Sequence, residues 1–248
     1  MPLCETEAVV LRTYRLGEAD KIASLFTRAL GRIRAVATGA LRPKSRYGGT
    51  LEPLSYVRLW VFERENRDLL RMNSAELVES FFDMQKDYRV QIGAQYVAEV
   101  AERALPEREV NERAFRLILA VLRALKRSAE IDRPLLYFNY WLVRLGGFLP
   151  NLGRCLRCGR ALDLNGGFFG PGSEGLVCQT CRTGATTRAI SGKALALFET
   201  ARASSLDAWL NAEKTPPGSR DARIFFEELI ESHLERKLQT RALLAEVG

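Results

Sequence analysis

Gly31-Arg32-Ile33-Arg34-Ala35-Val36-Ala37 is the stretch of sequence that decides the fold of the N-terminal part. Charged and apolar side chains alternate along it with a period of two, as in a β-strand that turns one face toward a core. Gly31 and Gly39 bracket this run, as turn residues do. The stretch therefore predicts a half-buried strand over residues 32–37.

Four similar runs lie within the first 80 residues. They are rich in apolar and β-branched residues and cover residues 7–14, 21–27, 56–62 and 68–77. Five short strands predict a small closed β-barrel, and the OB-fold is the commonest five-stranded solution. An SH3-like barrel is the alternative, because the number of strands does not separate the two.

From about Phe82 the apolar residues recur with the period of a helix. Ser191 has the residue type and position of a helix N-cap, and residues 211–219 read as a loop. The predicted helices cover residues 92–105, 115–125, 135–145, 191–201 and 219–243. The expected fold class is α+β, with several domains. These are an OB-fold domain at 1–80, a helical domain at 81–152 and 188–248, and a cysteine-containing insertion at 153–187.

The composition limits the function classes. The 248 residues are 47% hydrophobic, which excludes a disordered chain, and 37 Lys and Arg against 30 Asp and Glu give a net charge of +7. Such a chain is attracted to polyanions such as nucleic acid or an anionic membrane. No apolar run reaches the roughly 18 residues of a membrane helix, and the start of the chain lacks the basic residues of a signal peptide. We expect a cytoplasmic protein associated with the nucleoid.

Four of the five cysteines form two C-x2-C knuckles. Cys155 and Cys158 make the first, and Cys178 and Cys181 make the second. Two such turns can point four thiolates at one ion, so this spacing predicts one structural Zn²⁺ with no open coordination position. Gly159 relieves crowding directly after the first knuckle. The turn-rich segment between the knuckles has almost no hydrophobic core of its own. A bound metal would therefore hold this segment together where its side chains cannot.

Other uses of these cysteines are less favoured. Disulfides require an oxidising compartment, and a redox-active C-x-x-C is usually single and at a helix N-terminus. An iron–sulfur cluster remains an alternative. The single histidine, His233, lies in a helix-patterned segment and is interpreted as a helix-surface residue.

Basic residues concentrate between Asp20 and Glu52, where the sequence has no acid. Arg32 and Arg34 are two apart on a predicted strand and so share a face. The loop 42–49 interleaves bases with an aromatic residue and glycines, a composition suited to binding single strands. An unspecialised solvated loop is the alternative. The candidate nucleic-acid-binding residues are Lys21, Arg28, Arg32, Arg34, Arg42, Lys44, Arg46 and, for stacking on a base, Tyr47.

Catalytic motifs are not found. Residues 39–45 resemble a phosphate-binding loop, but Pro43 stands where a glycine with a free amide is required. We therefore expect a protein that is not an enzyme.

Short motifs run along nearly the whole chain. Besides the two knuckles, they are Leu16-Gly17-Glu18-Ala19-Asp20-Lys21-Ile22, Leu25-Phe26-Thr27, Gly31-Arg32-Ile33, Gly39-Ala40-Leu41-Arg42, Leu51-Glu52-Pro53, Arg144-Leu145-Gly146-Gly147-Phe148-Leu149-Pro150 and Leu238-Gln239-Thr240-Arg241-Ala242-Leu243-Leu244. Together, and in this order, these motifs resemble those of the bacterial RecO family of recombination mediators. Thr240 departs from the serine that the family tends to have.

The resemblance implies an OB-fold, a helical bundle and a zinc-binding insertion, and a role in DNA repair. Family members bind single- and double-stranded DNA and anneal complementary strands. With RecR they assist the loading of RecA onto strands coated by single-strand-binding protein. A protein–protein adaptor, whose barrel and zinc module bind partner proteins such as RecR or single-strand-binding protein, is the alternative function.

Overall fold

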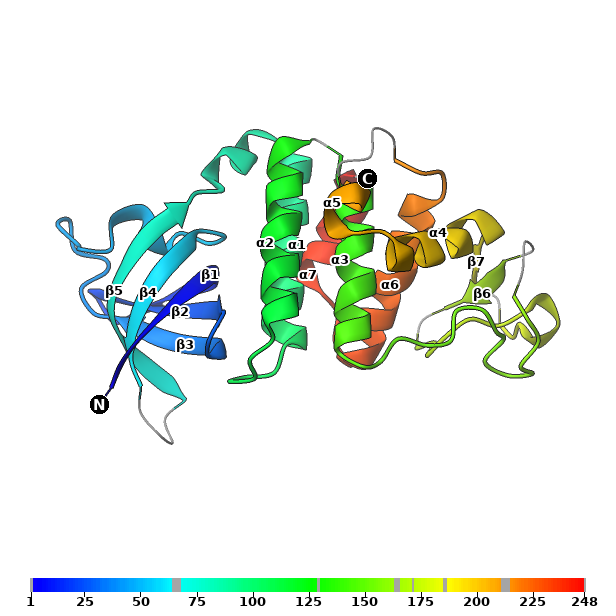
Figure 1. Cartoon of the computed structure of the whole chain (residues 1–248), viewed down its shortest axis with the longest axis horizontal. Helices are drawn as coiled ribbons and strands as arrows, with labels where there is room; N and C mark the ends of the chain where they lie inside the picture. The colour runs from blue at the N-terminus through cyan, green and yellow to red at the C-terminus, as the bar shows by residue number, and fades with distance from the viewer. Residues whose placement is uncertain are drawn as a thin grey trace. The chain divides into compact units, whose positions relative to one another are not determined.

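The structure is a computed structural model of the chain (Figure 1). It describes residues 2–63, 68–128, 130–162, 166–170, 172–184, 187–210 and 215–247. The chain forms two compact units, Met1–Lys126 and Arg127–Gly248, which are described separately. Within the described ranges, no helix combines the length and the apolar character needed to cross a membrane.

A closed five-stranded barrel forms the beginning of the first unit. Its strands are β1 (Leu3–Leu16), β2 (Asp20–Thr27), β3 (Gly31–Ala37), β4 (Tyr56–Phe62) and β5 (Leu69–Glu79). They follow the order β1-β2-β3-β5-β4, with β3 parallel to β5 and the other neighbours antiparallel. This five-stranded Greek-key closure confirms the OB-fold prediction.

The alternation seen in β3 determines which of its side chains enter the barrel. Ile33, Ala35 and Ala37 are buried in the core, whereas Arg32 and Arg34 lie on the outer face. The loop between β3 and β4 contributes two further core residues, Tyr47 and Leu51, and includes the short 3₁₀ helix η1 (Gly48–Leu51). The loop is thus tied to the barrel by its own side chains.

Three helical segments complete the first unit: η2 (Phe82–Lys86), α1 (Tyr88–Ala104) and α2 (Glu112–Arg127). The Asp87 side chain caps α1 by accepting hydrogen bonds from the backbone amides of Arg89 and Val90. Helix α2 packs on the barrel through Phe115, whose ring centroid lies 6.3 Å from that of Phe26.

The second unit contains five α-helices, one 3₁₀ helix and a two-stranded sheet in its described part. These are α3 (Asp132–Leu145), β6 (Gly167–Phe169), the 3₁₀ helix η3 (Gln179–Cys181), β7 (Arg188–Ile190), α4 (Gly192–Ala203), α5 (Leu206–Leu210), α6 (Ser219–His233) and α7 (Gln239–Val247). The Ser191 side chain caps α4 by accepting from the amide of Ala194, as predicted. His233 is exposed at the end of α6, as expected, and its ring stacks on Phe148 with centroids 3.8 Å apart.

The prediction of one long C-terminal helix was wrong, because the chain breaks between α6 and α7. Glu235 adopts a left-handed φ of 50° in this break. The carboxylate of Glu231 accepts a hydrogen bond of 2.8 Å from the amide of Leu238, which replaces the lost helical bonding at the start of the next segment. Hydrophobic periodicity continues through such a break, so it does not reveal it.

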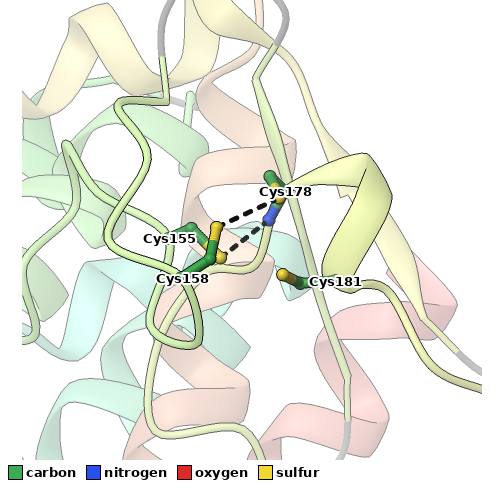
Figure 2. Close-up of side chains that lie close together, drawn as sticks. All are labelled: Cys155, Cys158, Cys178 and Cys181. Atoms are coloured by element: carbon green, nitrogen blue, oxygen red, sulfur yellow. Dashed lines mark hydrogen bonds between the residues drawn. The ribbon is translucent and has the colours of Figure 1, made fainter.

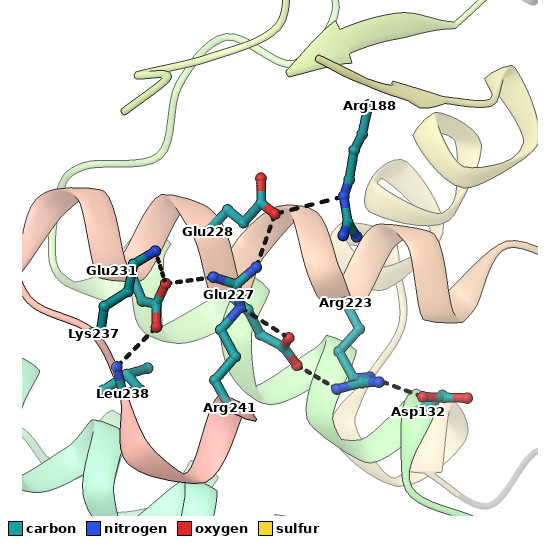
Figure 3. A network of polar contacts seen from close by, with 9 residues as sticks. All are labelled: Asp132, Arg188, Arg223, Glu227, Glu228, Glu231, Lys237, Leu238 and Arg241. Atoms are coloured by element: carbon teal, nitrogen blue, oxygen red, sulfur yellow. Dashed lines mark hydrogen bonds and ion pairs between the residues drawn. The ribbon is translucent and has the colours of Figure 1, made fainter. Parts of the chain in front are cut away.

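An ion-pair network holds α7 against α6 (Figure 3). Arg241 of α7 contacts three glutamates of α6: Glu227, Glu228 and Glu231. Burial raises the pKa of Glu227, and the charges of Arg223 and Arg241 oppose that rise. The two arginines therefore offset part of the cost of burying this carboxyl group.

We expect Arg241→Met to destabilise the second unit. The change takes one of two cations from each of Glu227 and Glu231, which are both almost fully buried and keep only Arg223 and Lys237. The free energy of unfolding should therefore fall by about 2 kcal/mol. Urea denaturation followed by circular dichroism measures this. Arg236→Met, which removes an exposed arginine with no ion pair among the described residues, is the control, and equal stability of the two variants would contradict the role of the network.

Candidate metal centre and nucleic-acid interface

The four cysteines of the two knuckles meet at one point (Figure 2). Cys155 and Cys158 lie on the loop before β6, Cys178 precedes η3, and Cys181 is the last residue of η3. Gly159 has a φ of +72°, which places the turn after the first knuckle in the left-handed region that glycine favours. The local sequence thus builds two tight turns that face each other.

The distances between the sulfur atoms suit a tetrahedral ion. All four Sγ atoms lie within 4.8 Å of one another, and those of Cys158 and Cys178 are 3.7 Å apart. A tetrahedron with metal–sulfur bonds of about 2.3 Å separates its sulfurs by about 3.8 Å. The predicted cysteines therefore form a cluster that could hold a metal ion, and four sulfur ligands fill its tetrahedral coordination shell.

Backbone hydrogen bonds favour the thiolate form of Cys155. Burial raises the pKa of Cys155, but hydrogen bonds from the backbone amides of Cys158, Cys178 and Arg157 outweigh it and lower the pKa to about 6. The amide of Cys178 donates to the Cys155 Sγ atom over 3.3 Å. Metal ions bind the thiolate form of cysteine, so the donors that lower this pKa also favour coordination.

The Cys181 thiol is the one that loses its proton least readily when the four sulfurs lie together without a cation. Hydrogen bonds with the sulfurs of Cys158 and Cys178 raise the pKa of Cys181 to about 12. A neighbouring thiolate keeps the proton on the last thiol, since several negative sulfurs at this separation repel one another. A bound divalent cation would remove this repulsion, so the donor set fits a metal.

The segment between the knuckles differs from the expectation of turns without a core. It forms β6, which pairs with β7, and Phe169 and Leu176 are buried. The Phe169 ring meets that of Phe225 of α6 with centroids 5.1 Å apart. The insertion is thus joined to the helices by aromatic packing, which a glycine-rich local sequence does not predict.

Three cations stand exposed on the loop between β3 and β4. Arg42, Lys44 and Arg46 form no ion pair within the described part of the chain, and all three are exposed. The base of the loop is held to the turn between β1 and β2, where the amide of Leu41 donates to the carbonyl of Ala19 over 2.9 Å. We call these three residues the basic loop.

Tyr47 has a different place from the one predicted. Its side chain is 1% exposed in the barrel core, and its hydroxyl donates to the carbonyl of Met72 over 3.1 Å. Arg46 donates to the same hydroxyl, and its guanidinium lies 5.2 Å from the ring centroid. This position corrects the expectation that Tyr47 stacks on a base, because the ring has no free face in this structure. It anchors the basic loop instead.

Lys21 and Arg28 are partnered inside the chain. The Lys21 Nζ atom lies 3.5 Å from Glu52. Arg28 pairs with Glu7 of β1 and, over 3.3 Å, with Glu112 of α2. A phosphate would have to compete with these carboxylates.

Arg32 and Arg34 share a face, as predicted, but that face meets the connection between α1 and α2. Both pair with Glu107, at 3.0 and 3.6 Å, and Arg32 also donates to the carbonyl of Leu105. Gly31 makes this approach possible, since a Cβ atom there would lie 2.2 Å from the carbonyl oxygen of Glu109. These two arginines therefore help to hold the helices on the barrel.

Our reading of the sequence missed another exposed cation near the basic loop. Arg15 lies at the end of β1, paired in register with Lys21, and has no carboxylate partner within the described ranges. The adjoining turn is the one that hydrogen-bonds to the basic loop. Arg15 directly follows the predicted strand 7–14, whereas β1 continues to Leu16 and includes it.

Comparisons with known proteins agree with this architecture. Residues 1–81 match the family described as Recombination protein O N terminal, and residues 85–242 match Recombination protein O C terminal. The chain is 40% identical over 242 residues, 98% of each chain, to DNA repair protein RecO of Koribacter versatilis. It is 31% identical to the protein of that name from Anaeromyxobacter dehalogenans strain 2CP-1, over 100% of this chain and 98% of the relative.

Proposed function

The chain belongs to the RecO family of DNA repair proteins, and from that premise we propose that it is a DNA-binding recombination mediator that performs no covalent chemistry. The observation that carries the proposal is the basic loop on the OB barrel. Arg42, Lys44 and Arg46 are exposed and free of carboxylates among the described residues. In the proposed domain organisation, residues 1–80 are the nucleic-acid-binding domain.

Phosphate neutralisation is the main source of affinity in this proposal. Each contact between a cation and a phosphate releases condensed counterions, which favours binding at low salt. The basic loop and Arg15 supply cations that have no carboxylate to leave among the described residues. Lys21, Arg28, Arg32 and Arg34 are secondary contacts, because each must give up or share a carboxylate.

Strand annealing follows from the same electrostatics. Two complementary strands repel each other, and a cationic surface that binds both reduces this repulsion and keeps them close. No proton transfer or nucleophile is needed. Binding both single- and double-stranded DNA is consistent with contacts that are made mainly to the backbone.

The proposed partners come from the family resemblance. RecR, single-strand-binding protein and, indirectly, RecA would convert DNA binding into the loading of a recombinase. In the alternative function the barrel and the cysteine module bind proteins and DNA affinity is incidental. Leu156, 58% exposed on the first knuckle, supports a protein contact there.

The proposed metal is one structural Zn²⁺ held by Cys155, Cys158, Cys178 and Cys181. Zinc is preferred because four cysteine sulfurs in tetrahedral spacing are its usual structural ligands. When bound, the ion would supply a crosslink between the two knuckles. The chain's own contribution is to present the four sulfurs and the amides that favour the thiolate of Cys155.

Salt-dependent binding tests the proposed function. We expect the affinity for a labelled oligo-dT to fall linearly with salt on logarithmic axes, with a slope of about −0.7 per phosphate contact. Fluorescence anisotropy between 50 and 300 mM salt, as a rough working range for such contacts, measures the slope. Binding of RecR without detectable DNA binding at physiological salt would favour the adaptor and overturn the proposal.

A further inference from the structure

We infer that the cysteine module is a second contact site for single-stranded DNA, formed by Arg160, Arg182 and Phe168. By cysteine module we mean residues 153–184, which carry both knuckles. The inference rests on the proposed function, since it adds a site to a DNA-binding protein. It concerns a different compact unit from the one that carries the basic loop.

The module presents several arginines without opposing charge. Arg154, Arg157, Arg160 and Arg182 are exposed, and none forms an ion pair within the described residues. Glu174 is the one acidic residue of the module that the structure describes, while Asp163 lies outside the described residues. The arginines are therefore open to an external anion.

A cavity lies between one of these arginines, Arg160, and the aromatic ring of Phe168. Its volume is about 440 Å³, and Arg160, Phe168 and Gln179 are among its lining residues. That size is within the range of about 300–1,000 Å³ typical of small-ligand sites. A single nucleotide is a ligand of this class, with an anionic end for Arg160 and a planar base for the ring.

Arg182 and Phe168 supply the stacking element. The guanidinium of Arg182 lies 4.9 Å from the centroid of the Phe168 ring. Its Nε atom donates to the hydroxyl of Thr187 over 2.7 Å, which fixes the side chain. Cations beside an aromatic ring are the combination that binds single strands without sequence preference. Phe168 itself is half-buried, and its ring is among the groups that line the cavity.

Charge balance at the metal is the competing explanation for these arginines. An ion of charge +2 with four thiolates carries a net charge of −2, and nearby cations stabilise it. This explanation predicts that arginine loss weakens metal retention but leaves the salt dependence of DNA binding unchanged. DNA contact predicts the reverse, so the two explanations are separable.

A second site gives annealing a physical basis within one chain. The basic loop can hold one strand while the cysteine module holds another, or a distant part of the same strand. A protein with both sites neutralises more phosphates than either alone, which raises the encounter rate of two polyanions.

The test compares Arg160→Glu/Arg182→Glu with Arg113→Glu/Arg116→Glu. The control pair changes the charge equally at two exposed α2 arginines that have no ion pair among the described residues. We expect the module variant to bind oligo-dT about tenfold more weakly than the control at physiological salt. We also expect its salt slope to be smaller by about 1.4, corresponding to two lost contacts at about 0.7 each. Metal content by elemental analysis verifies that the module remains assembled.

A milder variant and a crosslinking experiment test the inference even if the double glutamate variant misfolds. If the double glutamate variant loses metal, Arg160→Gln/Arg182→Gln takes its place, with an expected slope change of the same size. Photocrosslinking of an oligonucleotide that contains 5-iodouracil should label Phe168 in the full-length protein, as detected by mass spectrometry.

An unchanged salt slope in a metal-loaded module variant, with no crosslink to residues 153–184, would overturn the inference. Wild-type protein would still bind DNA in that case, and the proposed function would stand. Failure of the wild type to bind DNA at all would instead reject the proposed function.

Discussion

Replacing Arg42, Lys44 and Arg46 together by glutamate lowers the affinity for single-stranded DNA about a hundredfold at physiological salt. Each lost phosphate contact costs about 0.6 logarithmic units there, as follows from a slope of about 0.7 per contact. Three contacts account for nearly two units, and the new carboxylates add repulsion. These side chains are exposed and without ion pairs in the described chain, so the barrel should fold normally.

A charge-conserving variant is the matched control for this experiment. Arg42→Lys, Lys44→Arg and Arg46→Lys retain three cations in the same loop and should bind within about threefold of wild type, because phosphate affinity here is mainly Coulombic. Anisotropy titration of both variants with the same oligonucleotide provides the comparison. Equal affinity of the glutamate variant and the wild type would remove the basic loop from the binding surface.

Replacing Cys155 and Cys158 by serine should release the metal and unfold the cysteine module locally. Two ligands are lost from a four-sulfur site, and serine hydroxyls are poor zinc ligands at neutral pH. We expect about one zinc per wild-type chain and none per variant chain, measured on protein purified without added metal or chelator. Limited proteolysis should then cut within residues 153–187, while the barrel, with its own closed core, resists.

Cys4→Ser is the control for this experiment, because it removes a thiol that is not one of the four proposed zinc ligands. Cys4 is a free cysteine that packs against the barrel core and does not belong to the cluster of four. This variant should keep its zinc and its resistance to proteolysis. Wild-type protein that contains no metal, with all of its thiols reactive, would contradict the zinc assignment.

Local patterns determined much of what the sequence predicted correctly. The period of two over residues 32–37 places alternate side chains on opposite faces of β3, wherever the strand finds its neighbours. The C-x2-C spacing likewise makes a tight turn that points two sulfurs the same way. The five-stranded barrel, the Ser191 cap and the four-cysteine cluster were therefore predictable from short stretches of residues, whereas the strand order that distinguishes the OB-fold from an SH3-like barrel was not.

Tertiary structure alone decided which cations remain available and which residues are buried. Arg32 donates to a carbonyl 73 positions along the chain, because the connection between α1 and α2 folds back onto β3. Tyr47 enters the core of the barrel from a loop whose composition suggested exposure. The break after α6 depends on the Glu231 carboxylate of that helix, which accepts a hydrogen bond from the amide of Leu238 beyond the break. Periodicity and spacing report on neighbours within a few residues, whereas these contacts depend on how distant segments close around a core.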